Sequence, residues 1–236
     1  SELGRAIAVA FARVGAAIAI LDRDETAASA AAQAVQKAGG KAEIFVLDIG
    51  DEAQIERGFA DLAKRMGRLD VLVNSAAIAI RKPATELPRA DWEKVMSVNV
   101  TGSFLCARAA ARLMLPRAKG SIINMASIMG LSGGIYPNVS YQTSKGAVVN
   151  LTRALAMEWA RQGIRVNGIA PSWVRTELAM ALLEKPEVRA EIERATPMGR
   201  VAEVEEIVGA ALFLASRASS MVTGHILAVD GGYLAR

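Results

Sequence analysis

Residues 16–48 read AAIAILDRDETAASAAAQAVQKAGGKAEIFVLD, and this stretch decides the fold. Two short apolar runs, 16–21 and 43–47, each end at an aspartate, Asp22 and Asp48. An alanine-rich segment of helical composition separates them and ends at the glycine pair 39–40. Short, almost wholly apolar strands that alternate with helices are typical of a parallel sheet buried on both faces. The stretch therefore predicts a strand–helix–strand unit.

The same alternation continues in both directions along the chain. Further strands are expected at 71–73, 122–124, 164–166 and 225–229, and helices at 3–14, 51–66, 91–115, 139–161 and 204–215. Right-handed crossovers would arrange them as an α/β fold with a doubly wound parallel sheet, a Rossmann-like three-layer sandwich. Without repeats or a linker, residues 1–236 are expected to form a single domain that binds a dinucleotide and carries the catalytic site. The long irregular stretch 172–199 is expected to be a substrate lid.

The first strand of such a fold is absent from the sequence. A doubly wound nucleotide-binding sheet begins with a strand and a glycine-rich turn, whereas residue 3 already lies in the first expected helix. The sheet would then have a gap at its centre with unpaired backbone donors and acceptors. We expect roughly 10–20 native residues, a strand and its turn, ahead of Ser1, and intact-mass measurement tests this.

Composition excludes several classes of function. The 236 residues are 52% hydrophobic and 22% charged, so the chain can bury a core and is not disordered. A single cysteine, Cys106, and a single histidine, His225, leave no disulfide and no His/Cys zinc site, so no metal is expected. The 28 basic and 24 acidic residues are scattered, which disfavours nucleic acid as a partner. No apolar run is long enough for a membrane span, and no signal-peptide pattern is present, so we expect a cytoplasmic protein without a membrane partner.

Asp22 is the first candidate for cofactor binding. A carboxylate at the end of this strand of a nucleotide-binding sheet accepts hydrogen bonds from the adenosine ribose hydroxyls. It would repel a 2′-phosphate, which favours NAD over NADP, although the neighbouring Arg23 leaves NADP possible. Asp22 follows Gly4 by 18 residues, close to the spacing of a dinucleotide fingerprint. The alternative is that Asp22 only caps the following helix.

Tyr141 and Lys145 are spaced i and i+4 on an expected helix, which puts them on one face. Ser127 follows the strand at 122–124, at the edge of the sheet where ligands bind in open α/β folds. An ammonium about 4 Å from a phenol favours the phenolate by ~4 kcal/mol at an effective dielectric constant near 20, before desolvation reduces the gain. Tyr141 could then take a proton from an alcohol while a hydride leaves for the cofactor. The alternative is an amphipathic tyrosine beside a solvated lysine.

Taken together, several segments resemble the short-chain dehydrogenase/reductase family. They are Ser127, the YQTSK segment 141–145, Asn74 after a strand, Asn99 within VNV, RVNGIAP at 165–171 and VTGHILAVDGG at 222–232. The similarity extends over essentially the whole chain. It implies an oxidoreductase that uses NAD or NADP on a secondary alcohol or ketone, with a catalytic tetrad of Asn99, Ser127, Tyr141 and Lys145.

The resemblance also implies how a cofactor is held and how subunits assemble. Asp22 would bind the adenosine ribose, Asp48 and Ile49 the adenine, Lys145 the nicotinamide ribose, and Thr176 the carboxamide. Asn99 would hold a water that links Lys145 to solvent. The other implied cofactor contacts are Leu3, Gly4, Asn74, Ala76, Tyr141, Pro171 and Val174. The family usually forms homotetramers, here through alanine-rich faces of the helices at 91–115 and 139–161. Glu2 stands where the family has a glycine, so a carboxylate is expected near the pyrophosphate.

The substrate is a small alcohol or ketone that the sequence identifies only loosely. The segment IAIRKP at 78–83 is most similar to gluconate 5-dehydrogenase-like members of the family, which implies that Arg81 meets a sugar-acid carboxylate. The alternative is a solvated Arg81–Lys82 pair on a loop. Ser127 would bind the substrate oxygen, and Trp173 on the lid could line the substrate pocket.

Two other functions compete with the dehydrogenase. The segment GLSGG at 130–134 formally matches the nucleophile motif of a serine hydrolase, with Ser132 as nucleophile and His225 as base. The strand ends about six residues too early for a nucleophile elbow, however. A catalytically silent nucleotide-binding or scaffold protein of the same fold is the second alternative. It is favoured by the absent first strand and by Glu2, Ala77 and Ser172, which stand where the family has glycines. The intact tetrad opposes it.

Overall fold

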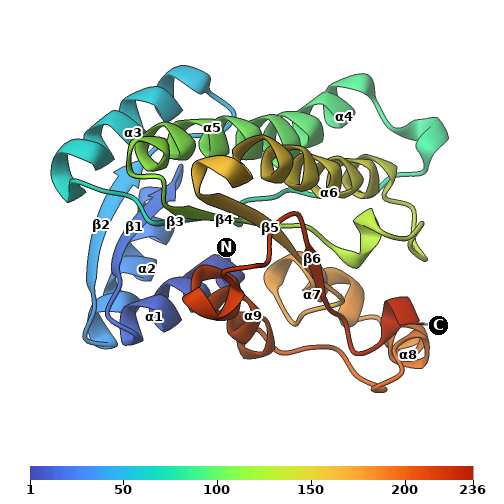
Figure 1. Ribbon diagram of the computed structural model, residues 1–236. Helices are drawn as coiled ribbons and strands as arrows, with labels where there is room; N and C mark the ends of the chain where they lie inside the picture. The colour runs from blue at the N-terminus through green and yellow to red at the C-terminus, as the bar shows by residue number, and fades with distance from the viewer. Residues whose placement is uncertain (236) are drawn as a thin grey trace.

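The strands of the computed structural model, which describes residues 1–235, pair in parallel (Figure 1). They are β1 (Ala17–Asp22), β2 (Lys41–Val46), β3 (Val71–Asn74), β4 (Gly120–Met125), β5 (Ile164–Pro171) and β6 (Ile226–Val229). Each strand is four to eight residues long and mostly apolar, as sheets buried on both faces require.

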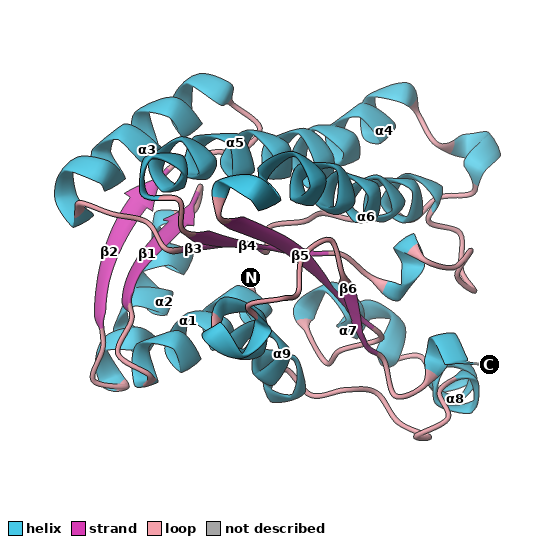
Figure 2. Cartoon of the chain, in the orientation of Figure 1, coloured by secondary structure: helices cyan, strands magenta, loops and turns pink. Residues whose placement is uncertain are grey.

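Helices cover both faces of the strands (Figure 2). The helices are α1 (Glu2–Arg13), α2 (Glu25–Lys37), α3 (Glu52–Met66), α4 (Arg89–Met96), α5 (Ser103–Met114), α6 (Val139–Trp159), α7 (Glu177–Leu183), α8 (Pro186–Ala195) and α9 (Glu205–Ala215). In the view of Figure 1, α3, α5 and α6 lie above the strands and α1, α2 and α9 below them. This arrangement confirms the predicted doubly wound α/β fold.

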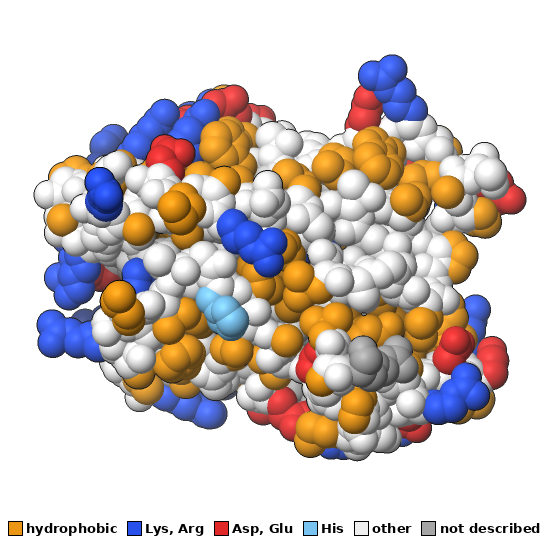
Figure 3. All heavy atoms as spheres, turned by 45° about the vertical axis from the view of Figure 1, so that its right-hand side comes forward, with side chains coloured by type: hydrophobic (Ala, Val, Ile, Leu, Met, Phe, Trp, Pro, Cys, Tyr) orange, Lys and Arg blue, Asp and Glu red, His pale blue; other side chains and the backbone are white. Residues whose placement is uncertain are grey.

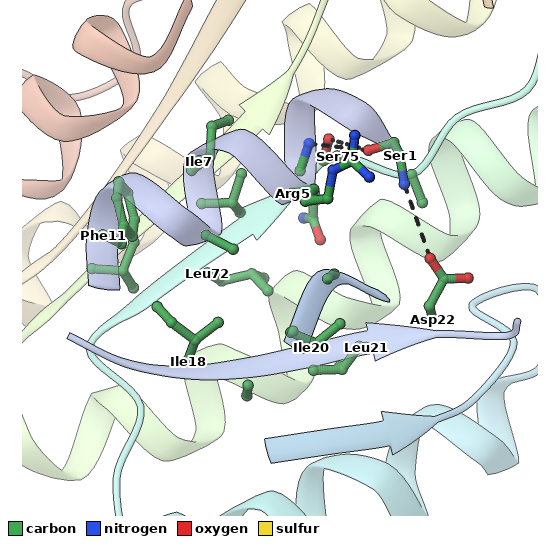
Figure 4. A pocket seen from close by; sticks show the side chains of 18 of the residues that line it. Ser1, Arg5, Ile7, Phe11, Ile18, Ile20, Leu21, Asp22, Leu72 and Ser75 are labelled. Atoms are coloured by element: carbon green, nitrogen blue, oxygen red, sulfur yellow. Dashed lines mark hydrogen bonds and ion pairs between the residues drawn. The ribbon is translucent and has the colours of Figure 1, made fainter. Parts of the chain in front are cut away.

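The strands form two sheets rather than one. In the described part of the chain β1 pairs with β2, and a separate sheet has the order β3-β4-β5-β6. The facing edges of β1 and β3, together with α1, enclose a cavity of about 690 Å³ (Figure 4). Ile18 and Ile20 line it from β1, and Leu72 from β3. The structure therefore has the central gap that the sequence predicts.

Side-chain caps explain where helices α2 and α3 begin. The Asp24 carboxylate accepts hydrogen bonds from the backbone N–H groups of Thr26 and Ala27, so Asp24 is the N-cap of α2. Asp51 caps α3 in the same way through the N–H of Gln54, at 3.1 Å. Asp22 is thus not the cap of the following helix, and its carboxylate remains at the end of β1.

Two expected elements differ from the structure. The helix expected over 91–115 is interrupted by a π-helical segment, Ser97–Gly102, between α4 and α5. Gly102 in this segment packs so closely on the loop after β2 that an added Cβ would lie 2.8 Å from the Ile49 carbonyl oxygen. The expectation of an irregular stretch at 172–199 is also wrong, because α7 and α8 form within it and Pro186 occupies the first turn of α8.

The alanines of α5 belong to the core of the chain itself. Ala107, Ala109, Ala110 and Ala111 are at most 4% exposed and pack in one cluster with Ile122 of β4. Small side chains let α5 lie close against the sheet. The expectation that the alanine-rich face of this helix forms a subunit interface is therefore wrong for these four residues.

The surface bears charges of both signs. On the face drawn in Figure 3, basic side chains are spread among acidic and neutral ones instead of forming one stripe. Within residues 1–235, no helix has the length and apolar character that crossing a membrane demands.

Candidate active site

A second cavity, of about 130 Å³, lies at the carboxyl ends of β4 and β5. Ser127, Tyr141 and Lys145 line it together with Arg81 and Trp173. The carboxyl edge of an open parallel sheet is where such folds bind ligands. The structure therefore brings together three of the four predicted catalytic residues and all of the predicted substrate residues.

The loop after β4 holds Ser127 against helix α6. The Ser127 hydroxyl accepts a hydrogen bond from the N–H of Met129 at the start of a short 3₁₀ turn, Ile128–Gly130. An added Cβ at Gly130 would lie 2.5 Å from the carbonyl carbon of Lys145. Only a glycine lets this turn lie directly on the helix that carries Tyr141 and Lys145.

Lys145 is buried, at 3% exposure, and its Nζ donates a 2.6 Å hydrogen bond to the carbonyl oxygen of Met125. The same Nζ lies 5.5 Å from the centre of the Tyr141 ring. Burial lowers the pKa of Lys145 to about 8, because the charged form loses hydration. The alternative of a solvated lysine beside an amphipathic tyrosine is therefore wrong.

The phenol of Tyr141 is influenced by three effects. Burial raises its pKa, whereas a hydrogen bond with Ser127 and the positive charge of Arg81 act in the opposite direction. Burial is the largest of these effects. The predicted gain from a neighbouring cation is thus smaller than the desolvation that opposes it, and the pKa of Tyr141 is raised. The cation that opposes desolvation is Arg81.

Asn99 lies in the π-helical segment and is 1% exposed. Its Nδ2 donates to the carbonyl oxygen of Ile78 and to the Ser144 hydroxyl, and its Oδ1 accepts from the Ile78 N–H, each at 2.9 Å. The side chain thus joins the loop after β3 to α6, beside Lys145. Its link to Lys145 through a water remains a prediction.

The predicted cofactor residues lie along both cavities, which share Ser75. The first cavity is lined by Gly4, Asp22, Ile49, Asn74 and Ala76, and the second by Leu3, Tyr141, Lys145, Pro171, Val174 and Thr176. Asp48 lines neither, because its carboxylate accepts from the Gly50 N–H at 2.8 Å and pairs with Arg23 at 3.8 Å. The two sets of residues therefore adjoin at Ser75.

Two of the predicted cofactor residues, Asn74 and Asp22, form polar contacts within the chain. The Asn74 side chain donates to the carbonyl oxygen of Ser103 and to Asn124 Oδ1, so it joins β3 to β4 and α5. The Asp22 carboxylate accepts from the Asp24 N–H at 3.1 Å and lies 4.0 Å from the Ser1 nitrogen (Figure 4). Asp22 thus retains capacity to accept further hydrogen bonds at the edge of the cavity.

Glu2 lines the first cavity, and its carboxylate is hydrogen-bonded. Its Oε2 accepts a 2.8 Å hydrogen bond from the N–H of Glu177 at the start of α7. The expected carboxylate near the pyrophosphate is therefore engaged with α7. At Gly4, an added Cβ would lie 2.9 Å from Ser1 Oγ, so the chain at the beginning of α1 is closely folded.

The hydrolase alternative is not supported by the geometry. Ser132 lies beyond the 3₁₀ turn that follows β4, and its hydroxyl donates to the carbonyl oxygen of Ile128 at 3.0 Å. A nucleophile elbow requires the serine between a strand and a helix.

Among residues 1–235, no group of three or more His, Cys, Asp or Glu side chains could hold a metal ion.

Comparisons with known proteins show which family the chain belongs to. A family model described as Enoyl-(Acyl carrier protein) reductase matches residues 1–234. Galactitol 2-dehydrogenase (L-tagatose-forming) of Cereibacter sphaeroides is 45% identical over 237 residues, 99% of this chain and 91% of that protein. Gluconate 5-dehydrogenase of Gluconobacter oxydans (strain 621H) is 40% identical over 232 residues, 98% of this chain and 90% of that protein.

A solved structure agrees as well. A gluconate 5-dehydrogenase from Burkholderia cenocepacia J2315, in complex with NADP and tartrate, has a TM-score of 0.95 at 38% identity. The match covers 99% of this chain and 91% of that one. Matches over nearly the whole chain, at these identities, show that the protein belongs to the short-chain dehydrogenase/reductase family, whose members are NAD(P)-dependent oxidoreductases of CH–OH groups.

Proposed function

We propose that this protein transfers a hydride between NAD or NADP and a hydroxylated secondary alcohol, a polyol or a sugar acid such as gluconate, or the matching ketone. The supporting observation is one cavity lined by the Tyr141 phenol, the Ser127 hydroxyl, the Arg81 guanidinium and the buried Lys145. A phenol beside a hydroxyl and a cation is suited to moving a proton on and off an alcohol oxygen.

Each side chain has a separate task. The Tyr141 oxygen takes the proton of the substrate hydroxyl during oxidation and returns it during reduction. Ser127 donates a hydrogen bond to the substrate oxygen, and Lys145 binds the nicotinamide ribose. Asn99 holds the water that connects Lys145 to solvent. When bound, the nicotinamide accepts or returns the hydride, and its oxidised ring adds positive charge that favours the phenolate.

Polar side chains at the carboxyl ends of β1 and β4 suit a dinucleotide. Asp22 offers a carboxylate to the adenosine ribose at one end, and Lys145 an ammonium to the nicotinamide ribose at the other. The other residues that would hold it are those predicted from the sequence: Leu3, Gly4, Asp48, Ile49, Asn74, Ala76, Pro171, Val174 and Thr176. The preference we propose is for NAD, because the Asp22 carboxylate would repel a 2′-phosphate. Arg23 pairs with Asp48 at 3.8 Å and so is partly neutralised.

Arg81 is the group that would recognise a sugar-acid carboxylate. Its guanidinium lines the cavity with Tyr141, and its charge acts on the phenol. The relatives include gluconate 5-dehydrogenases and a galactitol 2-dehydrogenase, and the Burkholderia protein is in complex with tartrate, a hydroxylated dicarboxylate. A bidentate arginine contact is the usual way to hold such a group.

Residues 172–199 would act as the substrate lid. Three hydrogen bonds join this segment to the rest of the site: Arg81 to the carbonyl oxygen of Leu178, Tyr136 to Glu191, and the N–H of Glu177 to Glu2. Each joins α7 or α8 to a residue that lines one of the two cavities: Glu2 lines the first, and Arg81 and Tyr136 line the second. Such contacts can be exchanged with a substrate at small cost, which a lid requires.

The assembly we propose is a homotetramer in the cytoplasm. Exposed apolar side chains remain on α5 and α6, where Phe104 is 37% and Met157 is 84% exposed. A single cysteine, buried on α5, suits a reducing compartment. Light scattering should then give a mass near four times that of the 24.9 kDa chain.

A spectrophotometric assay tests the proposed function. NADH and NADPH formation would be followed with gluconate, galactitol, D-threitol and 2-butanol at pH 7 and 9. We expect turnover of at least one hydroxylated substrate, faster at pH 9 because Tyr141 must lose its proton. Absence of turnover with every substrate in both directions, together with absence of calorimetric binding of either dinucleotide, would refute the proposal and favour the silent scaffold.

A further inference from the structure

Two buried polar atoms of the substrate cavity have no hydrogen-bond partner within residues 1–235. They are Asn138 Oδ1 and Trp173 Nε1. Both residues line the cavity together with Tyr141 and Ser127. A buried donor or acceptor left unpaired costs about 1–3 kcal/mol, so such groups normally have a partner. Two of them in the wall of one small cavity indicate that the partner is a ligand.

Trp173 follows the end of β5, and both its ring and its backbone have partners. Its ring meets that of Tyr136 edge to face, with centroids 6.0 Å apart and an angle of 78° between the planes. Its carbonyl oxygen accepts a 2.8 Å hydrogen bond from the N–H of Ala202. The indole N–H can only donate, so the ligand atom opposite it must be an acceptor.

Asn138 is placed just before α6, three residues ahead of Tyr141. It is the N-cap residue, and an asparagine in this position usually accepts a hydrogen bond from the first turn. Here the side chain makes no such bond, although its backbone oxygen accepts from the N–H of Gln142 at 3.0 Å. Helix capping therefore does not use the side-chain oxygen, which needs a donor.

Gln142 and Tyr136, which line the same cavity, already have hydrogen-bond partners within the protein. Gln142 Nε2 donates to the carbonyl oxygen of Tyr136 at 3.1 Å, and the Tyr136 hydroxyl donates to Glu191 at 2.6 Å. Ser140 Oγ is also buried without a partner, but Ser140 does not line the cavity. Among the residues that line the cavity, the buried side-chain atoms without a partner are thus one acceptor and one donor, both uncharged.

We propose that Asn138 and Trp173 form a subsite that binds the non-reacting hydroxyl groups of the substrate and so selects a polyhydroxylated carbon chain. The inference rests on the proposed function, in which Tyr141 acts on the reacting hydroxyl. A hydroxyl group is both donor and acceptor, so substrate hydroxyls satisfy Asn138 Oδ1 and Trp173 Nε1 together. A plain alkyl chain in the same place leaves both unpaired, and sites of this kind reject such analogues.

A matched pair of four-carbon substrates tests the subsite. D-threitol and 2-butanol both carry a secondary hydroxyl, but only D-threitol has further hydroxyls. The quantity measured is the ratio of kcat/KM for D-threitol to that for 2-butanol, in the protein itself, in Trp173→Phe and in Asn138→Ala. Trp173→Phe removes the N–H and keeps an aromatic ring. Trp92→Phe and Asn150→Ala, at residues that do not line the cavity, are the controls.

We expect the ratio to fall about tenfold in each of the two subsite variants and to stay unchanged in the controls. A ratio that stays unaltered in Trp173→Phe and Asn138→Ala, even if kcat/KM falls equally for both substrates, would overturn the subsite. If the unmodified protein oxidises 2-butanol as well as D-threitol, the subsite is overturned while the dehydrogenase stands. Turnover of neither substrate, nor of gluconate or galactitol, would instead count against the proposed function.

A thermal-shift measurement keeps the test valid if a variant loses activity through misfolding. D-threitol should raise the melting temperature of the protein and of both control variants more than equimolar 2-butanol does. Folded Trp173→Phe and Asn138→Ala proteins, recognised by a cooperative transition, should lose this difference. A difference that persists in both would contradict the proposal.

Discussion

The Nζ of Lys145 lies 5.5 Å from the centre of the Tyr141 ring, and its hydrogen bond goes to the carbonyl oxygen of Met125, at 2.6 Å. The lysine is therefore fixed by the end of β4 and not by the phenol. The charge that lowers the pKa of Tyr141 is that of Arg81, and it acts against the larger effect of burial. Burial raises the pKa of Tyr141 and lowers that of Lys145 to about 8.

Replacing the phenol tests the proton transfer. Tyr141→Phe removes one hydroxyl from the cavity and leaves the ring that packs beside Lys145. We expect kcat to fall by about 10²–10⁴-fold, the usual contribution of a general acid–base, with calorimetric NAD binding within a few-fold of the original. Turnover that survives in Tyr141→Phe would assign the proton transfer to another group.

The cofactor preference tests the role of Asp22. Its carboxylate lines the first cavity and does not cap α2, which Asp24 does. Asp22→Ala removes the repulsion of a 2′-phosphate, so the ratio of kcat/KM for NAD to that for NADP should fall about tenfold or more. Asp24→Ala is the matched control, since it weakens the helix cap by about 1 kcal/mol but leaves the preference unaltered. An unchanged ratio in Asp22→Ala would remove this residue from the cofactor site.

A substitution of Arg81 tests whether this residue links substrate binding to the ionisation of Tyr141. Its charge lowers the pKa of the phenol, against burial, which raises it. Arg81→Met should therefore shift the alkaline rise of the oxidation rate to higher pH, because the phenolate forms later. The KM for gluconate should also increase more than the KM for galactitol, which has no carboxylate.

Arg81→Lys provides the comparison for that variant. It keeps a positive charge but loses the bidentate geometry, so the pH profile should return toward the original while the KM for gluconate stays raised. If Arg81→Met alters neither the profile nor the KM values, Arg81 is only a solvated loop residue.

Burial of the Cys106 thiol makes the stability of the protein depend on pH. Burial raises the pKa of this thiol from 9.0 to about 12, so the folded state keeps the proton that the unfolded state loses above pH 9. The folded state then binds more protons, and the free energy of unfolding falls as the pH rises from 9 toward 12. At pH 10 the loss amounts to about 1.4 kcal/mol.

Urea unfolding of the original protein and of Cys106→Ala, each at pH 8 and pH 10, measures this contribution. The substitution itself removes a sulfur atom from the core and lowers stability at both pH values. The decrease between pH 8 and pH 10 should be smaller in Cys106→Ala by the amount given above. Equal decreases in the two proteins would show that the thiol is not shielded.

The sequence by itself determined the alternation of strands and helices, the cap at Asp51 and the pairing of Tyr141 with Lys145 on one helix. These features depend on the chemistry of residues a few positions apart, which repeat with the period of a strand or a helix. The gap beside β1 follows from the same order of elements. Asp22 at the end of its strand could be predicted for this reason as well.

Only the tertiary structure decided what desolvation and packing do to these residues. It raised the pKa of Tyr141 despite the charge of Arg81, engaged Asn99 with Ile78 and Ser144, and placed the alanines of α5 in the core. It also left Asn138 Oδ1 and Trp173 Nε1 without a hydrogen-bond partner in the described residues 1–235, in the lining of one cavity, although the two residues are 35 positions apart in the chain. Burial and hydrogen-bond satisfaction depend on segments far apart in sequence, which no local pattern encodes.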